Sequence, residues 1–259
     1  MRARAAACLL AAALAAGCAA RRADPAVEVR RALAERLAAR GDWGAAFEAA
    51  DALVREDPAD RRARLLRAQA LRHGGALAEA EADLDRVLRA DAGDAAAHGE
   101  LALVCEETRR PEEALRHHRE AARLDPESAR AANNLGFALL ARGRPAEAVP
   151  ILEAALQRHP ADARLRNNLG FAYAAGGDFT RAARQFALGG TPAQARHNLG
   201  VAYERGQNLE RAYDLYLEAA KLDTGLHLPR TNLVHVARQL GRPLPPEAAG
   251  AGELTRGAP

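Results

Sequence analysis

Asparagine is the residue whose type and spacing suggest a binding chemistry in this chain. Asn134, Asn168, Asn198 and Asn232 each stand directly before a recurring leucine. Asparagine is a mediocre residue inside a helix because its amide competes with the backbone for hydrogen bonds. The same amide carries donors and an acceptor, as a peptide unit does. Four asparagines at the same position before a leucine therefore indicate one of two roles. They either bind an extended peptide or form hydrogen bonds within and between neighbouring structural repeats.

The other reactive side chains lack the spacing of a catalytic or metal site. No pair among Cys8, Cys18 and Cys105 has the spacing of metal ligands or of a disulfide framework. His117 and His118 are adjacent, so on a helix they point about 100° apart and we expect solvated side chains. We find no phosphate loop, nucleophile elbow or zinc motif in the sequence. The sequence therefore predicts a non-enzymatic protein with no cofactor and no metal.

Composition predicts an all-α fold. Ala, Leu and Arg dominate the 259 residues, and aromatic residues make up only 4%. Ala, Leu and Arg favour helix because they lose little side-chain entropy there. The formal net charge of +3 falls to +1 (3 − 2) without Arg2 and Arg4 of the apolar N-terminal segment. Arg and Glu alternate along the predicted helices and form no basic stripe, which argues against nucleic-acid binding.

A repeat with a period of about 34 residues organises most of the chain. Pro58 and Pro126 are separated by two such periods, and Pro126 and Pro160 by one. A Leu-Gly pair recurs in the same register, and an alanine follows its glycine by twelve residues, as in Gly136 and Ala148. We expect two antiparallel helices per repeat, with Gly and Ala at the closest backbone approach and Pro ending the second helix. The pattern resembles the tetratricopeptide repeat family.

This resemblance implies an all-α, right-handed superhelix of about six helix pairs over residues 27–241. The repeats are predicted at 27–60, 61–94, 95–128, 129–162, 163–192 and 193–226, with a capping helix at 227–240. The fifth repeat is four residues short, because Gly200 follows Gly170 by four positions fewer than the full period, and its second helix should break at residues 189–192. Three prolines after the capping helix predict a disordered tail at 242–259.

The N-terminal residues combine a positive start, an apolar run and a cysteine. The apolar run of residues 5–16 is twelve residues long, too short to span a bilayer core of about 30 Å. Small residues then precede Cys18, although Ala15 stands where lipoprotein signals usually carry Leu. The pattern resembles a bacterial lipoprotein signal peptide, which implies removal of residues 1–17 and acylation of the Cys18 sulfur. The alternatives are an ordinary secretion signal cut near Ala16 and a plain apolar start.

The lipoprotein resemblance also implies a location. Three acyl chains bury far more CH₂ groups than the single chain that gives only marginal membrane binding. Ala19 follows the cysteine, where lipoproteins retained in the inner membrane tend to carry Asp. We therefore expect a lipid-anchored protein of the outer membrane that faces the periplasm. Residues 18–26 would form its lipidated N-terminus and a short linker.

In the tetratricopeptide family the slot of the four asparagines points into a groove lined by the first helix of each repeat. The implied peptide-binding residues are Asn134, Asn168, Asn198, Asn232, Phe137 and Phe171. Phe137 and Phe171 lie three residues after two of the asparagines, so they would contact apolar side chains of the peptide. The first three repeats carry Ala32, Leu66 and Glu100 in the asparagine slot. The N-terminal half is therefore expected to be a spacer or to pack on another partner.

Several longer segments narrow the functional class. Residues 133–156, 164–186, 195–223 and 231–241, taken with the N-terminal cysteine motif, resemble tetratricopeptide lipoproteins of tight-adherence (Flp) pilus assembly. The resemblance implies a scaffold that binds proteins or extended peptides, among them an outer-membrane secretin, and the membrane through its lipid. It implies no small-molecule substrate. The alternative is an adaptor for another envelope machine: a type IV pilus pilotin, a cell-wall enzyme complex or polysaccharide export. A repeat-bearing enzyme is disfavoured because the repeats leave no room for a catalytic domain.

Overall fold

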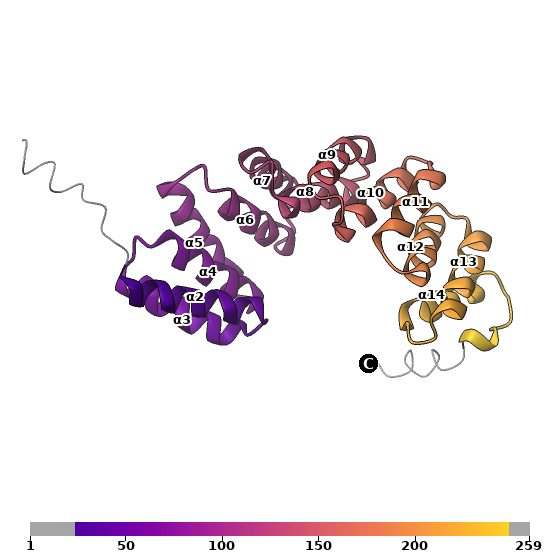
Figure 1. The fold of residues 1–259 in the computed structure, drawn as a ribbon, viewed down its shortest axis with the longest axis horizontal. Coiled ribbons are helices and arrows are strands. Elements are labelled where there is room, and N and C mark those ends of the chain that lie inside the picture. The colour runs from indigo at the N-terminus through magenta and orange to yellow at the C-terminus, as the bar shows by residue number, and fades with distance from the viewer. Residues whose placement is uncertain (1–23, 249–259) are drawn as a thin grey trace, which may run out of the picture. The chain divides into compact units, whose positions relative to one another are not determined.

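The computed structural model describes residues 24–248, which form helices joined by short turns (Figure 1). This part of the chain contains thirteen α-helices, α2 to α14, and one 3-10 turn, so the predicted all-α class is confirmed. The helices are α2 (Pro25–Ala39), α3 (Trp43–Glu56), α4 (Arg61–His73), α5 (Leu77–Ala90), α6 (Ala95–Glu107), α7 (Pro111–Leu124), α8 (Ala129–Ala141), α9 (Pro145–Arg158), α10 (Ala163–Ala175), α11 (Phe179–Gly189), α12 (Pro192–Arg205), α13 (Leu209–Leu222) and α14 (His227–Gln239).

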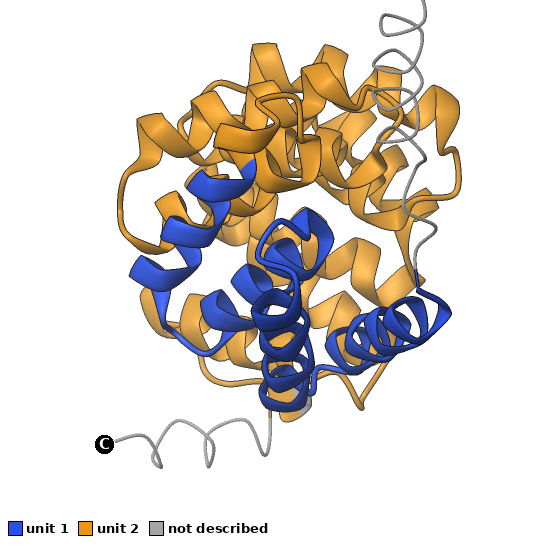
Figure 2. Ribbon diagram, turned by 90° about the vertical axis from the view of Figure 1, so that its left-hand side faces the viewer, with its two compact units in different colours: residues 1–87 blue, residues 88–259 orange. Residues whose placement is uncertain are grey.

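The helices form six consecutive pairs and a closing helix. The pairs run from α2 with α3 to α12 with α13, and α14 packs on α13. This is the number of pairs that the sequence repeat predicts. The chain divides into two compact units, coloured separately in Figure 2. We call their described parts the N-terminal unit (residues 24–87) and the C-terminal unit (residues 88–248).

Each first helix begins at a short polar residue that recurs with the repeat. Asp60, Asp94, Ser128 and Asp162 follow one another at the full repeat spacing, and each side chain accepts a hydrogen bond from the backbone N–H three residues later. Thr191 does the same for α12. Such caps satisfy a backbone donor that has no partner inside the helix. They fix where each first helix starts and therefore which slots share a face.

Glycine in the first helix makes room for a large side chain of the second helix. A Cβ on three of these glycines would approach that side chain to 2.5–2.7 Å, closer than real contacts allow. The pairs share one sequence separation and are Gly136 with Leu152, Gly170 with Phe186, and Gly200 with Tyr216. The side chain nearest each of these glycines is therefore the large residue sixteen positions later. The alanine twelve residues after the glycine is fully buried nearby, as Ala148 and Ala182 show.

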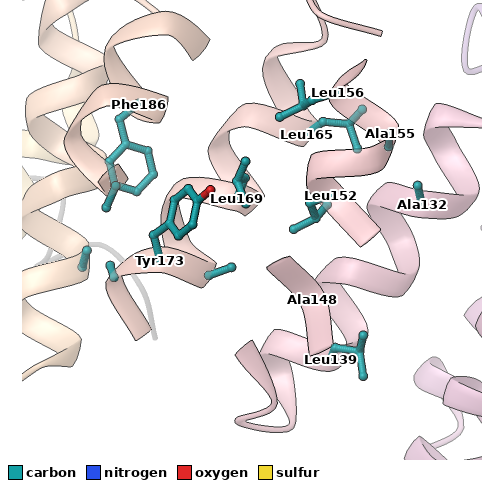
Figure 3. Close-up of a cluster of buried hydrophobic side chains, with 14 of the residues drawn as sticks. Ala132, Leu139, Ala148, Leu152, Ala155, Leu156, Leu165, Leu169, Tyr173 and Phe186 are labelled. Atoms are coloured by element: carbon teal, nitrogen blue, oxygen red, sulfur yellow. The ribbon is translucent and has the colours of Figure 1, made fainter. Parts of the chain in front are cut away.

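Leu152 and Phe186 belong to a continuous core in the C-terminal unit, whereas Tyr216 packs in a separate cluster with Leu233. The core runs from Leu115 in α7 to Leu215 in α13, and Figure 3 shows its middle part. Leu152 and Phe186 are 0% exposed and Leu139 is 1% exposed. Isolated helices of this length are marginal in water, so their stability depends on this packing.

The fifth repeat is irregular as its short spacing predicts. α11 has 11 residues, whereas α9 and α13 each have 14. The missing turn lies at the C-terminal end of α11, where the backbone becomes extended at Gly190. α12 then begins at once, with Thr191 and Gln194 forming a capping box. The deficit therefore shortens one second helix and leaves the first helices on both sides complete.

The disordered tail predicted from residue 242 is wrong for its first residues, which the structure describes to residue 248, and the rest of that tail lies outside the described residues. Residues 246–248 form a 3-10 turn. Ala248 is 3% exposed and packs with Tyr216 and Leu233. The turn extends the closing cover over α13 and α14 beyond the predicted capping helix.

Buried ion pairs tie the helices of the N-terminal unit together. Asp83 of α5 is 3% exposed and accepts from Nη1 of Arg64 at 2.9 Å and from Nε of Arg67 at 2.7 Å. Nη1 of Arg67 also donates to Oδ1 of Asp51 in α3, at 2.7 Å. Two arginines of α4 are thus fixed between the helices on either side. Buried charges of this kind are tolerated only when each is paired.

Candidate protein-binding face

The first helices of the C-terminal unit carry the four predicted asparagines. Asn134 lies on α8, Asn168 on α10, Asn198 on α12 and Asn232 on α14, and all four are partly buried. α8 packs on α10, and α10 packs on α12. The shared slot therefore places the first three asparagines along adjacent helices. We call this side of α6, α8, α10 and α12 the first-helix face.

Two of the asparagines hydrogen bond across neighbouring repeats. Nδ2 of Asn168 donates to Oδ1 of Asn133 at 2.8 Å, and Nδ2 of Asn198 donates to Oδ1 of Asn167 at 3.1 Å. These are inter-repeat bonds, the structural alternative that the sequence left open. Each uses one amide N–H, and an asparagine side chain has two N–H donors and an acceptor oxygen. The bonds orient the amides and leave them hydrogen-bonding capacity for a ligand.

The two outer asparagines have different surroundings. Asn232 hydrogen bonds the phenol of Tyr216. Asn134 lines a small cavity of about 80 Å³ between α6, α7 and α8, together with His118 and Arg130. The four asparagines therefore share a slot without sharing one set of partners.

The two predicted phenylalanines differ in exposure. Phe137 on α8 is 56% exposed. Phe171 on α10 is partly buried, with its ring centroid 4.9 Å from that of Phe186 in an edge-on contact. The guanidinium of Arg205 lies 5.3 Å over the Phe171 ring. Phe137 is therefore the open apolar contact of the pair, and Phe171 is largely covered by protein.

The phenylalanine slot holds two further apolar residues that the sequence analysis missed. Leu103 on α6 stands one full repeat before Phe137, and Val201 on α12 follows Phe171 by the length of the short repeat. Both are partly buried. We call Leu103, Phe137, Phe171 and Val201 the apolar stripe. The repeat register alone could have identified it.

Val201 of the apolar stripe packs against a cluster that contains a buried tyrosine of α13. Tyr216 is 0% exposed, and its hydroxyl donates to Oε2 of Glu204 at 2.6 Å. Burial, followed by the hydrogen bond to Glu204, raises the pKa of Tyr216, so the phenol remains a donor at neutral pH. Burial also lowers the pKa of His197, beside Asn198, so this imidazole is neutral at pH 7. The arrangement is structural and adds no reactive group.

The histidine pair on α7 departs from its prediction. His118 is 1% exposed, and its Nε2 lies 3.3 Å from Oε1 of Glu106, so the expected solvated side chain is wrong. His118 is buried because it stands one repeat before Leu152 and occupies the same core position. His117 instead pairs with His98, Nδ1 to Nδ1 at 2.9 Å. Among residues 24–248, no group of three His, Cys, Asp or Glu side chains is arranged to hold a metal ion.

Family models match almost the whole helical region. One tetratricopeptide repeat model matches residues 31–95, 78–129 and 100–151. Two others match residues 139–194 and 193–225. The matches join without a gap over residues 31–225. This chain belongs to the tetratricopeptide repeat family.

Solved structures of repeat proteins share this fold. YrrB, described as a TPR protein with an unusual peptide-binding site, is 25% identical; the match covers 74% of this chain and 100% of YrrB, with a TM-score of 0.57. Pseudomonas aeruginosa PilF is 19% identical over 83% of this chain and 98% of PilF, with a TM-score of 0.65. A tetratricopeptide repeat protein of Parabacteroides merdae is 16% identical over 83% of this chain and 86% of its own, with a TM-score of 0.56. A search of curated proteins gave no significant match.

The predicted membrane anchor concerns residues at the N-terminus. The signal peptide at 1–17 and the lipidation site Cys18 lie outside the described residues. The first described helix, α2, begins at Pro25, seven residues after Cys18. In the part of the chain that the structure describes, no helix is both long and apolar enough to cross a bilayer.

Proposed function

We propose that this tetratricopeptide repeat protein is a non-enzymatic scaffold that holds an extended segment of another protein along the apolar stripe. The exposed ring of Phe137 carries the proposal. It is 56% exposed, although the neighbouring members of the stripe are partly buried. Exposed large apolar side chains in register with further apolar residues are typical of interaction surfaces. The similarity to YrrB, a repeat protein with a peptide-binding site, supports the proposal.

The stripe and the amides beside it suit a peptide backbone. Alternate side chains of an extended peptide point to one side, so they can contact Phe137 and its neighbours in succession. The amides of Asn134 and Asn168 lie one helical turn away and offer donors and acceptors to the peptide units between those side chains. Such a site selects a peptide by its extended conformation and its apolar side chains more than by a particular sequence.

We also propose that the scaffold is anchored to the envelope by a lipid on Cys18 and faces the periplasm from the outer membrane. The support is the order of positive start, apolar run, small residues and cysteine. Palmitate labelling should be lost in Cys18→Ala and retained in the matched control Cys8→Ala, which removes a thiol inside the apolar run. Continued labelling of Cys18→Ala would refute the anchor.

The partner that we propose is the secretin of a tight-adherence (Flp) pilus. Its support is the resemblance of residues 133–156 and 164–186 to the lipoproteins of that system. Deletion of the gene should abolish heat-stable secretin multimers on a non-reducing gel. The wild-type chain should restore the multimers, and Phe137→Asp should not, although it should accumulate to the wild-type level because residue 137 is exposed.

Normal secretin multimers in the deletion strain would contradict the secretin proposal. If the Phe137→Asp strain then showed a defect in another envelope machine, the adaptor alternative would be supported. Full function of Phe137→Asp in every envelope assay would instead show that the apolar stripe is not the binding surface.

A further inference from the structure

The first described helix, α2, carries two large apolar side chains that the rest of the N-terminal unit leaves exposed (Figure 1). Val29 is 67% exposed and Leu33 is 49% exposed. They stand four residues apart, so they lie on one side of the helix, one turn from each other. Arg31 and Ala34 of the same helix are buried, and the helical spacing of about 100° per residue places them on the opposite side. The side with Val29 and Leu33 therefore faces away from the helices that α2 packs on.

Val29 and Leu33 occupy positions that are buried in later repeats. In the register of Val29, Ala63, Ala97 and Leu165 are each 0% exposed. The leucines that follow Leu33 in its register are at most 7% exposed; they are Leu101, Leu135, Leu169, Leu199 and Leu233. Later first helices such as α8, α10 and α12 pack on the helix before them, whereas no helix precedes α2 among the described residues. The exposed side of α2 is thus a stacking surface without its neighbour.

Two arginines continue this side of α2 toward its C-terminal end. Arg36 and Arg40 follow Leu33 by three and seven residues, so they extend the same line along the helix. Arg36 also stands in a buried register, since Val104 is 0% exposed there. Both arginines are exposed, and neither side chain makes an ion pair within residues 24–248. We call Val29, Leu33, Arg36 and Arg40 the outer α2 face.

The acidic side chains of α2 lie away from the outer α2 face. Glu28 and Glu35 stand about 140° and 160° around the helix from Leu33. Glu28 is also paired with Arg31, Oε1 to Nη1 at 2.6 Å. The face is therefore apolar in its first half and basic in its second half, and it carries no carboxylate.

The outer α2 face lies close to the predicted anchor. Pro25, the first residue of α2, follows Cys18 by seven residues, which span at most about 25 Å when fully extended. A lipid on Cys18 would hold α2 within that distance of the bilayer. Such a tether raises the effective concentration of the face at the membrane, so contacts too weak to bind a membrane by themselves can form. Apolar residues beside arginines are also the composition of helices that lie at a lipid surface.

We propose that α2 lies on the membrane surface, with Val29 and Leu33 in contact with lipid acyl chains and Arg36 and Arg40 in contact with lipid phosphates. Long arginine side chains suit this arrangement, because the stem can stay in apolar surroundings while the guanidinium reaches the headgroups. The proposal rests on the lipid anchor proposed at Cys18 and is independent of the apolar stripe. Its consequence is a fixed orientation of α2 on the bilayer, which a flexible lipid tether alone does not impose.

The test couples the mature chain (residues 18–259) to vesicles chemically, so that it does not depend on acylation in the cell. The vesicles contain phosphatidylcholine, phosphatidylglycerol and a lipid with a maleimide headgroup. The maleimide reacts with Cys18, because Cys105 is buried and Cys8 belongs to the removed segment.

A tryptophan on α2 then reports contact with lipid. Leu33→Trp is placed in a Trp43→Phe background, which removes the only native tryptophan. Its fluorescence is compared on vesicles with and without dibrominated phosphatidylcholine, whose bromine atoms quench tryptophan near the acyl chains. The matched control is Glu35→Trp in the same background, an exposed position on the other side of the same helix. We expect at least threefold stronger quenching at position 33 than at position 35.

A charge reversal tests the basic half of the face. Arg36→Glu, added to the chain with tryptophan at position 33, should reduce the quenching at least twofold. Arg86→Glu is its control, because Arg86 is exposed on α5 and makes no ion pair within the described residues. It should leave the quenching unchanged. Unaltered far-UV circular dichroism checks that each variant is folded.

Equal quenching at positions 33 and 35 would overturn the proposal. So would a tryptophan at position 33 that bromolipid does not quench but that is shielded from aqueous iodide, together with the mass of a dimer for the uncoupled chain; this result would assign the face to a second copy of the chain. Failure of the anchor is distinguishable from both results. Palmitate labelling that persists in Cys18→Ala would refute the anchor, whereas the chemically coupled chain reports on α2 alone.

Discussion

Replacing Phe186 by alanine is expected to lower the free energy of unfolding of the C-terminal unit by about 3–5 kcal/mol. Phe186 is 0% exposed and fills the space that Gly170 leaves open in α10. Its loss removes a large apolar surface from the core and leaves a cavity between α10 and α11. The glycine on the facing helix cannot fill that cavity, since it has no side chain. Urea unfolding followed by far-UV circular dichroism measures the change.

Phe137→Ala is the matched control for this prediction. The chemical change is the same, but Phe137 is 56% exposed on α8. Substitutions at exposed positions usually change stability by no more than about 0.5 kcal/mol. Similar losses in the two variants would contradict the assignment of Phe186 to the core and of Phe137 to the surface.

Replacing Asp83 by alanine is expected to destabilise the N-terminal unit by about 3–5 kcal/mol, the cost of breaking a buried ion pair from one side. Asp83 is the shared acceptor of Arg64 and Arg67, whose side chains are only 10% and 18% exposed. Without it, Arg64 loses its ion-pair partner, and Arg67 keeps only Asp51 of α3. Trp43 lies in the same unit, so its fluorescence during urea unfolding reports this loss separately from the C-terminal unit.

Asp85→Ala is the control for this second prediction. It removes a carboxylate from the same helix two residues later, at an exposed position. We expect a change within about 0.5 kcal/mol. A loss in Asp85→Ala as large as that in Asp83→Ala would show that the effect comes from the net charge of α5 and not from the buried network.

The repeat made most of the fold predictable. Polar caps such as Asp94 and Asp162 recur at the spacing of the prolines, so helix starts follow from the sequence within a few residues. The break after α11 could also be read from the sequence, because a deficit of four residues cannot be absorbed inside a helix pair without losing about one turn. A cap or spacing that recurs along the chain predicts the helix boundaries more reliably than a single occurrence does.

The partners of individual side chains were harder to predict. The register shows that Asn168 and Asn198 share a slot, but which amide each one meets depends on the distance between neighbouring repeats. Two adjacent histidines predict solvated side chains, but the position of His118 within the repeat places it in the core.

Photo-crosslinking in living cells tests the central claim that the first-helix face of the C-terminal unit binds a partner. A benzophenone amino acid placed at residue 137 should give one dominant crosslinked product, with the secretin as the protein that we propose. Leu188 and Leu222 are each 56% exposed, as is Phe137, so the same substitution there controls for exposure and should give no such product. A dominant adduct at 137 alone is the result that this account predicts. No adduct at 137, or the same adduct at all three positions, would contradict it.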